Sequence, residues 1–380
     1  MTETSREGKL PPPSLPDELL HEILARVPYR SLCRFRCVSP SWRALCSDPG
    51  ILRRSPQTFS GFFCYALDDI RDARFLNFPG RSGGRRPLVD PSFPFLRDAG
   101  YAHDFIILDC GGLLLCECFT SPTPSSQLDS DYVVCNPATE DWTVLPRTEE
   151  LHPRNIIRLG FDPAAPSRFA VFVLLQDLDN GGELTGVVEI YSSETGLWTS
   201  RLQVDEWGQG TAVDGYYGED SVSVFLNGIL HLSTDHSSIV TVDMDGKTLA
   251  EFGRPFSGPG YIGQSQGRLH AIEIVQRFDG CCLLAVWVLE DYASGDWTMK
   301  QAENILELLG REICKKDESY TFIAIHPECD IIFFMDGVEE RLMSYDMDSK
   351  KVHVVYNKGE HYLPPYLPYT PCFAEWLPTR

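Results

Sequence analysis

A hairpin pattern recurs at a nearly constant interval through most of this 380-residue chain. Each copy has a polar second residue, a short turn and, seven positions after its first residue, a tryptophan or an aliphatic residue. The first residues are 56, 51, 48 and 55 positions apart, and the copies are Cys135-Asn136…Trp142, Tyr191-Ser192…Trp198, Val242-Asp243…Leu249, Glu290-Asp291…Trp297 and Tyr345-Asp346…Val352. A repeat of about 50 residues that carries several strands is typical of a β-propeller blade.

A strand with a buried pattern precedes each hairpin, at residues 112–117, 168–174, 228–233, 267–273 and 330–335. One blade leaves both faces of its sheet uncovered, so several blades must stack and the ring must close. Residues 59–88 have room for a sixth blade, and residues 366–376 can supply a closing strand. We therefore predict six blades, with seven as the alternative count. A β-sandwich is the competing fold, and the even spacing argues against it.

The first part of the chain has helical periodicity instead. Over residues 16–27 the apolar side chains form one stripe, made of Leu19, Leu20, Ile23, Leu24 and Val27. A second helix is expected over residues 31–38, and Ser39 is expected to cap a third, with Pro40 in its first turn. Three helices in about forty residues make too small a core to stand alone, so we expect a partner to cover the remaining apolar face.

Residues 15–43 resemble an F-box. The resemblance depends on the Leu15-Pro16 start, the Leu19-Leu20-x-x-Ile23-Leu24 stripe, the Cys37-Val38-Ser39 turn and the following Trp42. The remainder is similar to the F-box-associated propeller domains of plant F-box proteins, at Ser55-Pro56-Gln57, Gly61-Phe62-Phe63, residues 110–116, Asn136-Pro137-Ala138-Thr139, Gly160-Phe161-Asp162-Pro163 and Phe373-Ala374-Glu375-Trp376. Tyr191 and Trp198, after Gly181-Gly182, are similar to a kelch repeat in one copy only, so we do not assign a kelch protein.

This resemblance implies an α+β multidomain protein with a disordered tail (1–13), a three-helix F-box (14–54) and an all-β propeller (55–380). It implies the substrate-recognition subunit of an SCF-type ubiquitin ligase. The F-box would dock on a Skp-type adaptor held by a cullin–RING core, and the propeller would bind a protein target. An interaction scaffold without ligase activity is the alternative.

The adaptor contacts that the resemblance implies are Leu15, Pro16, Leu19, Leu20, Ile23, Leu24, Val27, Leu32, Val38 and Trp42. For each residue, the competing interpretation is packing inside the three helices. We favour that packing for Phe35 and Leu45. Leu15 and Pro16 lie outside the helical stripe, so for these two we favour contact with the partner. No target-binding residue is predicted.

Charge and cysteine content restrict the class of partner and the compartment. The net charge is −21, although residues 1–56 hold nine Lys/Arg and only six Asp/Glu. An acidic body repels phosphate, which argues against nucleic acid. No apolar run approaches the ~20 residues of a membrane span, and residues 1–14 lack the apolar stretch of a signal peptide. Thirteen cysteines without a CxxC pair indicate reduced thiols, and hence the cytoplasm or nucleus.

Two short motifs suggest enzymes, and we interpret both as loops. Gly263-Gln264-Ser265-Gln266-Gly267 matches G-x-S-x-G, but the alternating residues after it predict a strand where a nucleophile elbow needs a helix. Residues 258–263 match G-x-G-x-x-G without a βαβ unit around them. We therefore predict a non-catalytic chain without a cofactor.

Candidate metal ligands are equally sparse. His326 with Cys329, and Cys116 with Cys118, could each be half of a zinc site, but neither has a second pair at zinc-finger spacing, so we predict structural packing. Residues 177–180 have too few oxygen ligands for calcium. Arg81, Arg85 and Arg86 form a basic stretch that we interpret as a solvated loop, with an acidic target or a phosphate as the alternative ligand.

Overall fold

The computed structural model describes residues 15–27, 29–48, 50–51, 58–66, 69–78, 89–102, 105–121, 130–152, 155–162, 168–177, 183–202, 223–234, 237–257, 260–276, 282–311, 320–337, 339–357 and 362–373. The chain divides into two compact units, Met1–Thr58 and Phe59–Arg380, and each is described by itself. The predicted tail, residues 1–13, lies outside the described residues.

The N-terminal unit contains helices α1 (Asp17–Leu24), α2 (Tyr29–Phe35) and α3 (Pro40–Leu45). The predicted cap of the third helix is confirmed, because the Ser39 side chain accepts a hydrogen bond of 3.2 Å from the backbone N–H of Trp42. The first helix is shorter than predicted, since residues 25–27 form a turn, and the second begins two residues earlier than predicted.

The core of this unit is small. Its buried members are Leu24, Leu32, Cys46 and Ile51, and its partly buried members are Leu20, Val27, Phe35, Trp42 and Leu45. The rings of Phe35 and Trp42 meet edge to face, with centroids 5.6 Å apart. One apolar side of α1 therefore packs inward onto the other two helices.

The second unit is built of six sheets among its described residues, which we number as blades. Blade 1 is β1 (Gly61–Ala66), β2 (Asp69–Asn77) and β23 (Tyr362–Tyr369); blade 2 is β3 (Phe105–Cys110), β4 (Leu114–Phe119), β5 (Ser130–Asn136) and β6 (Asp141–Val144); blade 3 is β7 (Ile156–Phe161), β8 (Phe169–Asp177), β9 (Glu183–Ser192) and β10 (Leu197–Leu202).

Blade 4 is β11 (Ser223–Leu226), β12 (Ile229–Ser233), β13 (Ser238–Asp243) and β14 (Thr248–Gly253); blade 5 is β15 (Tyr261–Ser265), β16 (Arg268–Gln276), β17 (Cys282–Asp291) and β18 (Asp296–Asn304); blade 6 is β19 (Tyr320–Ile325), β20 (Ile331–Asp336), β21 (Arg341–Asp346) and β22 (Lys351–Tyr356). Two short helices, α5 (Pro94–Asp98) and α6 (Ile305–Leu308), were not predicted. In the four-stranded blades, neighbouring strands are consecutive in the chain and antiparallel.

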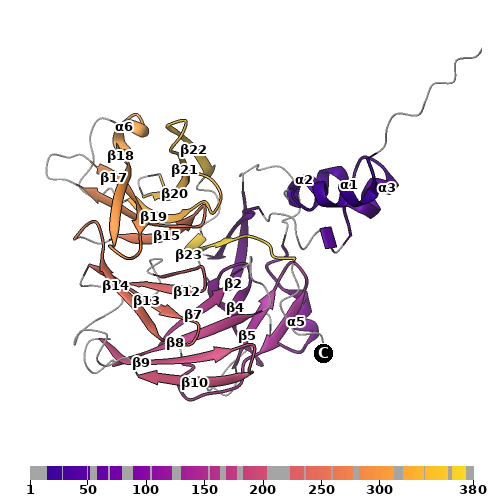
Figure 1. The fold of residues 1–380 in the computed structure, drawn as a ribbon, viewed down its shortest axis with the longest axis horizontal. Helices are drawn as coiled ribbons and strands as arrows, with labels where there is room; N and C mark the ends of the chain where they lie inside the picture. The colour runs from indigo at the N-terminus through magenta and orange to yellow at the C-terminus, as the bar shows by residue number, and fades with distance from the viewer. Residues whose placement is uncertain are drawn as a thin grey trace, which may run out of the picture. The chain divides into compact units, whose positions relative to one another are not determined.

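The ring closes through a strand from the far end of the chain. The pairing of β23 with β1 runs antiparallel from Gly61 opposite Tyr369 to Ala66 opposite Tyr362; β23 is the yellow strand of Figure 1. The first strands of blades 2 to 6 contact one another in sequence, and β23 contacts both β19 and β3. The six-bladed prediction is therefore confirmed. The closing strand lies at Tyr362–Tyr369, earlier than the predicted residues 366–376.

The apolar core lies between the blades. Six clusters in the described part of the propeller each join two neighbouring blades. Leu115 of blade 2 and Val171 of blade 3 share one such cluster, and Ile272 of blade 5 and Phe334 of blade 6 share another. A blade is apolar on both faces, and each face is covered by the next blade, which explains why the sequence repeats.

Two of the three tryptophans of the repeat, Trp198 and Trp297, link consecutive blades. The indole N–H of Trp198 donates a hydrogen bond of 2.8 Å to the carbonyl oxygen of Pro146, and that of Trp297 donates one of 2.9 Å to Gly253. Both carbonyl groups belong to residues that come before the tryptophan's own blade in the chain. A large apolar side chain with one donor thus fastens an outer strand to the preceding blade.

Candidate functional site

The N-terminal unit exposes apolar side chains that its own core does not use. Leu19 and Ile23 lie four residues apart on α1 and are 52% and 48% exposed, while Leu15 and Val38 are 55% and 66% exposed. Pro16 is also exposed. We call Leu15, Leu19, Ile23 and Val38 the exposed apolar surface. Because α1 also buries Leu24, it is apolar on two sides, and its own unit covers only one of them.

The structure separates the ten predicted adaptor contacts into three groups. Leu15, Pro16, Leu19, Ile23 and Val38 are exposed; Leu20, Val27 and Trp42 are partly buried; Leu24 and Leu32 are buried, at 2% and 0% exposed. The last two form the core that holds the exposed group in place. That all ten contact an adaptor stays a prediction.

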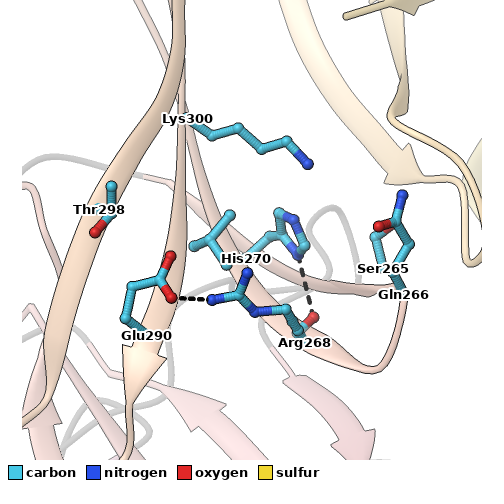
Figure 2. A pocket seen from close by; sticks show the side chains of 8 residues that line it. Ser265, Gln266, Arg268, His270, Glu290, Thr298 and Lys300 are labelled. Atoms are coloured by element: carbon cyan, nitrogen blue, oxygen red, sulfur yellow. Dashed lines mark hydrogen bonds and ion pairs between the residues drawn. The ribbon is translucent and has the colours of Figure 1, made fainter. Parts of the chain in front are cut away.

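The propeller holds a polar pocket of about 220 Å³ beside the β15–β16 turn (Figure 2), lined by Ser265, Gln266, Arg268, His270, Val288, Glu290, Thr298 and Lys300. These residues come from all four strands of blade 5 and from the turn itself, and His270 lies opposite Val288, which lies opposite Thr298. The pocket therefore extends across one face of blade 5, from β15 to β18. The sequence drew attention to Ser265 and Gln266 only through the G-x-S-x-G motif, which we interpreted as a loop, and it did not predict a binding site from these residues.

Blade 6 contributes to the pocket through the turn between β19 and β20. The Nζ atom of Lys300 lies 2.6 Å from Oδ1 of Asp330, and Nε2 of Gln266 donates to the same oxygen at 3.1 Å. The backbone N–H of Gln266 donates to the carbonyl oxygen of Pro327. On the other side, Arg268 forms an ion pair with Glu290. Both cations of the pocket are therefore paired with carboxylates.

His270 is buried at the base of the pocket with one ring nitrogen unused. The residue is 2% exposed, and Nδ1 lies 3.1 Å from the carbonyl oxygen of Arg268. A carbonyl only accepts, so Nδ1 carries the proton and Nε2 presents a lone pair. Nε2 has no hydrogen-bond partner among the described residues. Burial is the main cause that lowers the pKa of His270, with nearby Lys300 contributing, so the neutral ring is favoured.

A sequence signal for His270 existed and was overlooked. The second strand of blade 4 begins Gly228-Ile229-Leu230-His231, and that of blade 5 begins Gly267-Arg268-Leu269-His270. The shared Gly-x-Leu-His places a histidine on the same face of both blades, and Nε2 of His231 also lacks a partner. His231, however, packs against the ring of Tyr292, with centroids 5.7 Å apart.

The G-x-S-x-G motif is a hairpin, as predicted. Ser265 ends β15, and β16 begins at Arg268, so no helix follows. The Ser265 hydroxyl is fully buried and donates a hydrogen bond of 2.7 Å to the carbonyl oxygen of His326 in blade 6. The serine therefore fastens two blades together. Of the G-x-G-x-x-G motif, residues 258–259 lie outside the described residues, and Gly260 leads directly into β15.

The candidate metal ligands have structural roles. Nδ1 of His326 accepts hydrogen bonds from the backbone N–H groups of Glu328 and Cys329, at 3.1 and 3.2 Å, so this ring caps the β19–β20 turn. Cys116 and Cys118 are buried in β4. Within the described ranges, no group of three or more His, Cys, Asp or Glu is placed to hold a metal ion. Residues 178–180 and the basic stretch Arg81, Arg85 and Arg86 lie outside those ranges.

Among the described residues, no helix is long and apolar enough to cross a membrane. A small helical unit with an uncovered apolar surface, followed by a closed propeller, defines a protein with two interaction modules. The model of the F-box domain matches residues 12–54, and that of the F-box associated beta propeller domain matches residues 96–253. The chain therefore belongs to the F-box proteins of the plant type, in which an F-box precedes an F-box-associated β-propeller.

Similar proteins come from Arabidopsis thaliana. F-box protein At5g07610 is 28% identical over 308 residues, which are 75% of this chain and 69% of that protein. F-box protein At5g49610 is 26% identical over 337 residues, which are 82% of this chain and 86% of that protein. The second similarity spans most of both chains.

Proposed function

We propose that this chain is the substrate-recognition subunit of an SCF-type ubiquitin ligase. In this proposal the exposed apolar surface of the F-box binds a Skp-type adaptor, the adaptor connects the chain to a cullin–RING core, and the propeller holds a protein target. The chain itself performs no chemistry. It raises the local concentration of the target beside the ubiquitin-conjugating enzyme, so transfer gains from proximity. The complex would act in the cytoplasm or the nucleus.

The observation that carries the proposal is the exposure of Leu15, Leu19, Ile23 and Val38 on a unit with a four-residue buried core. Covering apolar surface releases about 25 cal/mol per Å², so four half-exposed side chains together contribute several kcal/mol to binding. A partner helix or groove that covers this surface would also stabilise a unit that is too small to be stable by itself.

Co-purification with a Skp-type adaptor tests the proposal. We expect the full chain to retain the adaptor and the double variant Leu19→Ala, Ile23→Ala to lose it, because both side chains are exposed and the core remains intact. The matched control is Leu249→Ala with Val354→Ala, which removes two exposed apolar side chains from outer strands of the propeller. Failure of the wild type to bind, or equal binding by both double variants, would contradict the proposal.

The alternative is an interaction scaffold that does not act in a ligase. Such a scaffold would bind the adaptor through the same surface, but it would not lead to ubiquitination of a target. Reconstitution with adaptor, cullin and RING subunits separates the two: recruitment of the cullin and ubiquitination of a propeller-bound protein support the ligase, and stable adaptor binding without cullin recruitment supports the scaffold.

A further inference from the structure

The pocket on blade 5, whose Gln266 and Lys300 contact Asp330 of blade 6, has an unmatched hydrogen-bond acceptor at its base. Nε2 of His270 is buried and carries a lone pair, and no donor in the described part of the chain lies opposite it. A buried acceptor without a donor costs about 1–3 kcal/mol, so its presence at the base of an open pocket points to a ligand that supplies a donor.

Two side chains of the pocket have more N–H groups than carboxylate partners. Lys300 has three N–H groups and one carboxylate partner, Asp330, while Arg268 has five N–H groups and one carboxylate partner, Glu290. Figure 2 shows Lys300 reaching from β18 toward the ring of His270. A ligand group that donates a hydrogen bond to Nε2 of His270 and accepts one from Nζ of Lys300 would pair both atoms at once.

The charge and the volume of the pocket narrow the class of ligand that it can bind. Because both cations already face carboxylates, their charges are compensated within the pocket, which favours a neutral ligand over an ionised one. A cavity of about 220 Å³ is smaller than the ~300–1,000 Å³ of small-molecule sites and suits a single side chain. A carboxamide carries a donor and an acceptor on separate atoms, and it can therefore bridge two groups that do not bond each other directly.

We propose that this pocket is a recognition subsite for an asparagine or glutamine side chain of the target protein, with the amide N–H donating to Nε2 of His270 and the amide oxygen accepting from Lys300. The proposal deepens the function proposed above and rests on it in one respect, namely that the propeller is the part that holds the target. It assigns the subsite to the pocket on one face of blade 5.

A peptide library tests the subsite on the full chain. The library consists of degenerate nonapeptides, divided into pools in which the central position is fixed as one amino acid. We expect the wild type to retain the Gln or Asn pool at least about threefold to tenfold more than the average pool, because one bond to the neutral ring of His270 and one charge-assisted bond from Lys300 form together. His270→Phe, which keeps a ring without the acceptor, and Lys300→Met should lose this preference.

The chain offers matched controls for both variants. His231→Phe changes the equivalent histidine of blade 4, and Lys350→Met removes another lysine that pairs with a carboxylate of the neighbouring blade, Glu303. Both controls should keep the preference. If His270→Phe does not fold, Lys300→Met against Lys350→Met decides the question. No preference in the wild type, a preference for acidic, basic or hydroxyl residues, or a preference that survives Lys300→Met overturns the inference.

The adaptor pull-down is a separate readout, so the two proposals can fail independently. A chain that selects carboxamide peptides without binding an adaptor would keep the subsite and reject the ligase role. A chain that binds the adaptor without selecting carboxamides would keep the ligase role and reject the subsite.

Discussion

Asn136 donates a hydrogen bond of 2.8 Å from Nδ2 to the backbone carbonyl oxygen of Cys372, 236 residues later in the chain. Both residues are buried. The Oδ1 atom of Asn136 accepts from the backbone N–H of Ala138 at 3.0 Å, so one side chain holds the hairpin of blade 2 and also the segment that follows β23. The ring is therefore closed by side-chain contacts in addition to the pairing of β23 with β1.

Replacement of Asn136 should weaken this closure. We expect Asn136→Ala to lower the free energy of unfolding by about 1–3 kcal/mol, since it removes two hydrogen bonds made by a buried side chain. Chemical denaturation of the full chain measures the change. Thr139→Val is the control in the same turn, because the Thr139 hydroxyl is buried and has no hydrogen-bond partner within the described ranges, so its removal should cost little. Equal losses in the two variants would contradict this role of Asn136.

The ion pair between Arg311 and Asp336 should matter more than any exposed pair. Asp336 is 1% exposed and receives both Nη atoms of Arg311, at 3.0 and 2.7 Å, while the Tyr320 hydroxyl accepts from the same guanidinium. Arg311→Met removes the guanidinium that neutralises this buried carboxylate, which we expect to cost about 3–5 kcal/mol.

Arg341→Met is the matched control for this pair. Arg341 pairs with Glu339, and both side chains are 41% exposed, so the loss should stay below about 1 kcal/mol. The two variants are compared by chemical denaturation at neutral pH. A similar loss in both would show that the burial of Asp336 does not set the strength of its ion pair.

The F-box core should respond differently from the exposed apolar surface. Leu32 is fully buried among the three helices, so Leu32→Ala should cost about 2–5 kcal/mol and increase hydrogen exchange across residues 15–48. Leu15→Ala should leave exchange in the free chain unchanged, because Leu15 is more than half exposed. Hydrogen exchange followed by mass spectrometry reads each unit separately. Increased exchange in Leu15→Ala would mean that Leu15 belongs to the core.

Acidification should destabilise the propeller through His326. Burial lowers the pKa of this ring from 6.5 to about 4, and Nδ1 must stay unprotonated to accept from Glu328 and Cys329. The unfolded chain therefore takes up the proton first as pH falls. The stabilisation present above pH 6.5 is lost progressively between pH 6.5 and pH 4.

His326→Asn tests the pH dependence. Asparagine supplies an oxygen acceptor for the same turn and does not titrate, as Asn136 does for Ala138. The melting temperature of this variant should fall less than that of wild type between pH 7 and pH 5, while His231 and the carboxylates affect both proteins equally. Parallel pH profiles for the two proteins would contradict the assignment to His326.

The local periodicity of the sequence predicted most of the architecture. Each predicted buried strand overlaps an observed one, since 267–273 falls on β16 and 330–335 falls on β20. Turn residues and alternating side chains are local properties that a strand keeps wherever it lies, so they can be recognised without coordinates. The two short helices α5 and α6 escaped prediction, because five and four residues are too few to show a helical period.

Contacts between blades were decided only by the tertiary structure. The sequence marked Ser265 as a candidate nucleophile and His326 as a candidate metal ligand. In the fold the Ser265 hydroxyl donates to the backbone carbonyl oxygen of His326 in the next blade, and the His326 ring caps its own turn. The sequence did not mark His270 or Lys300, whose significance depends on Asp330 of the next blade. Likewise Leu19 and Leu24 both belong to the predicted helical stripe, and the sequence does not show which of them is buried. In the structure Leu19 is exposed and Leu24 is buried. A sequence pattern shows which face is apolar, whereas only the folded chain determines what covers that face, because the covering residues come from distant segments.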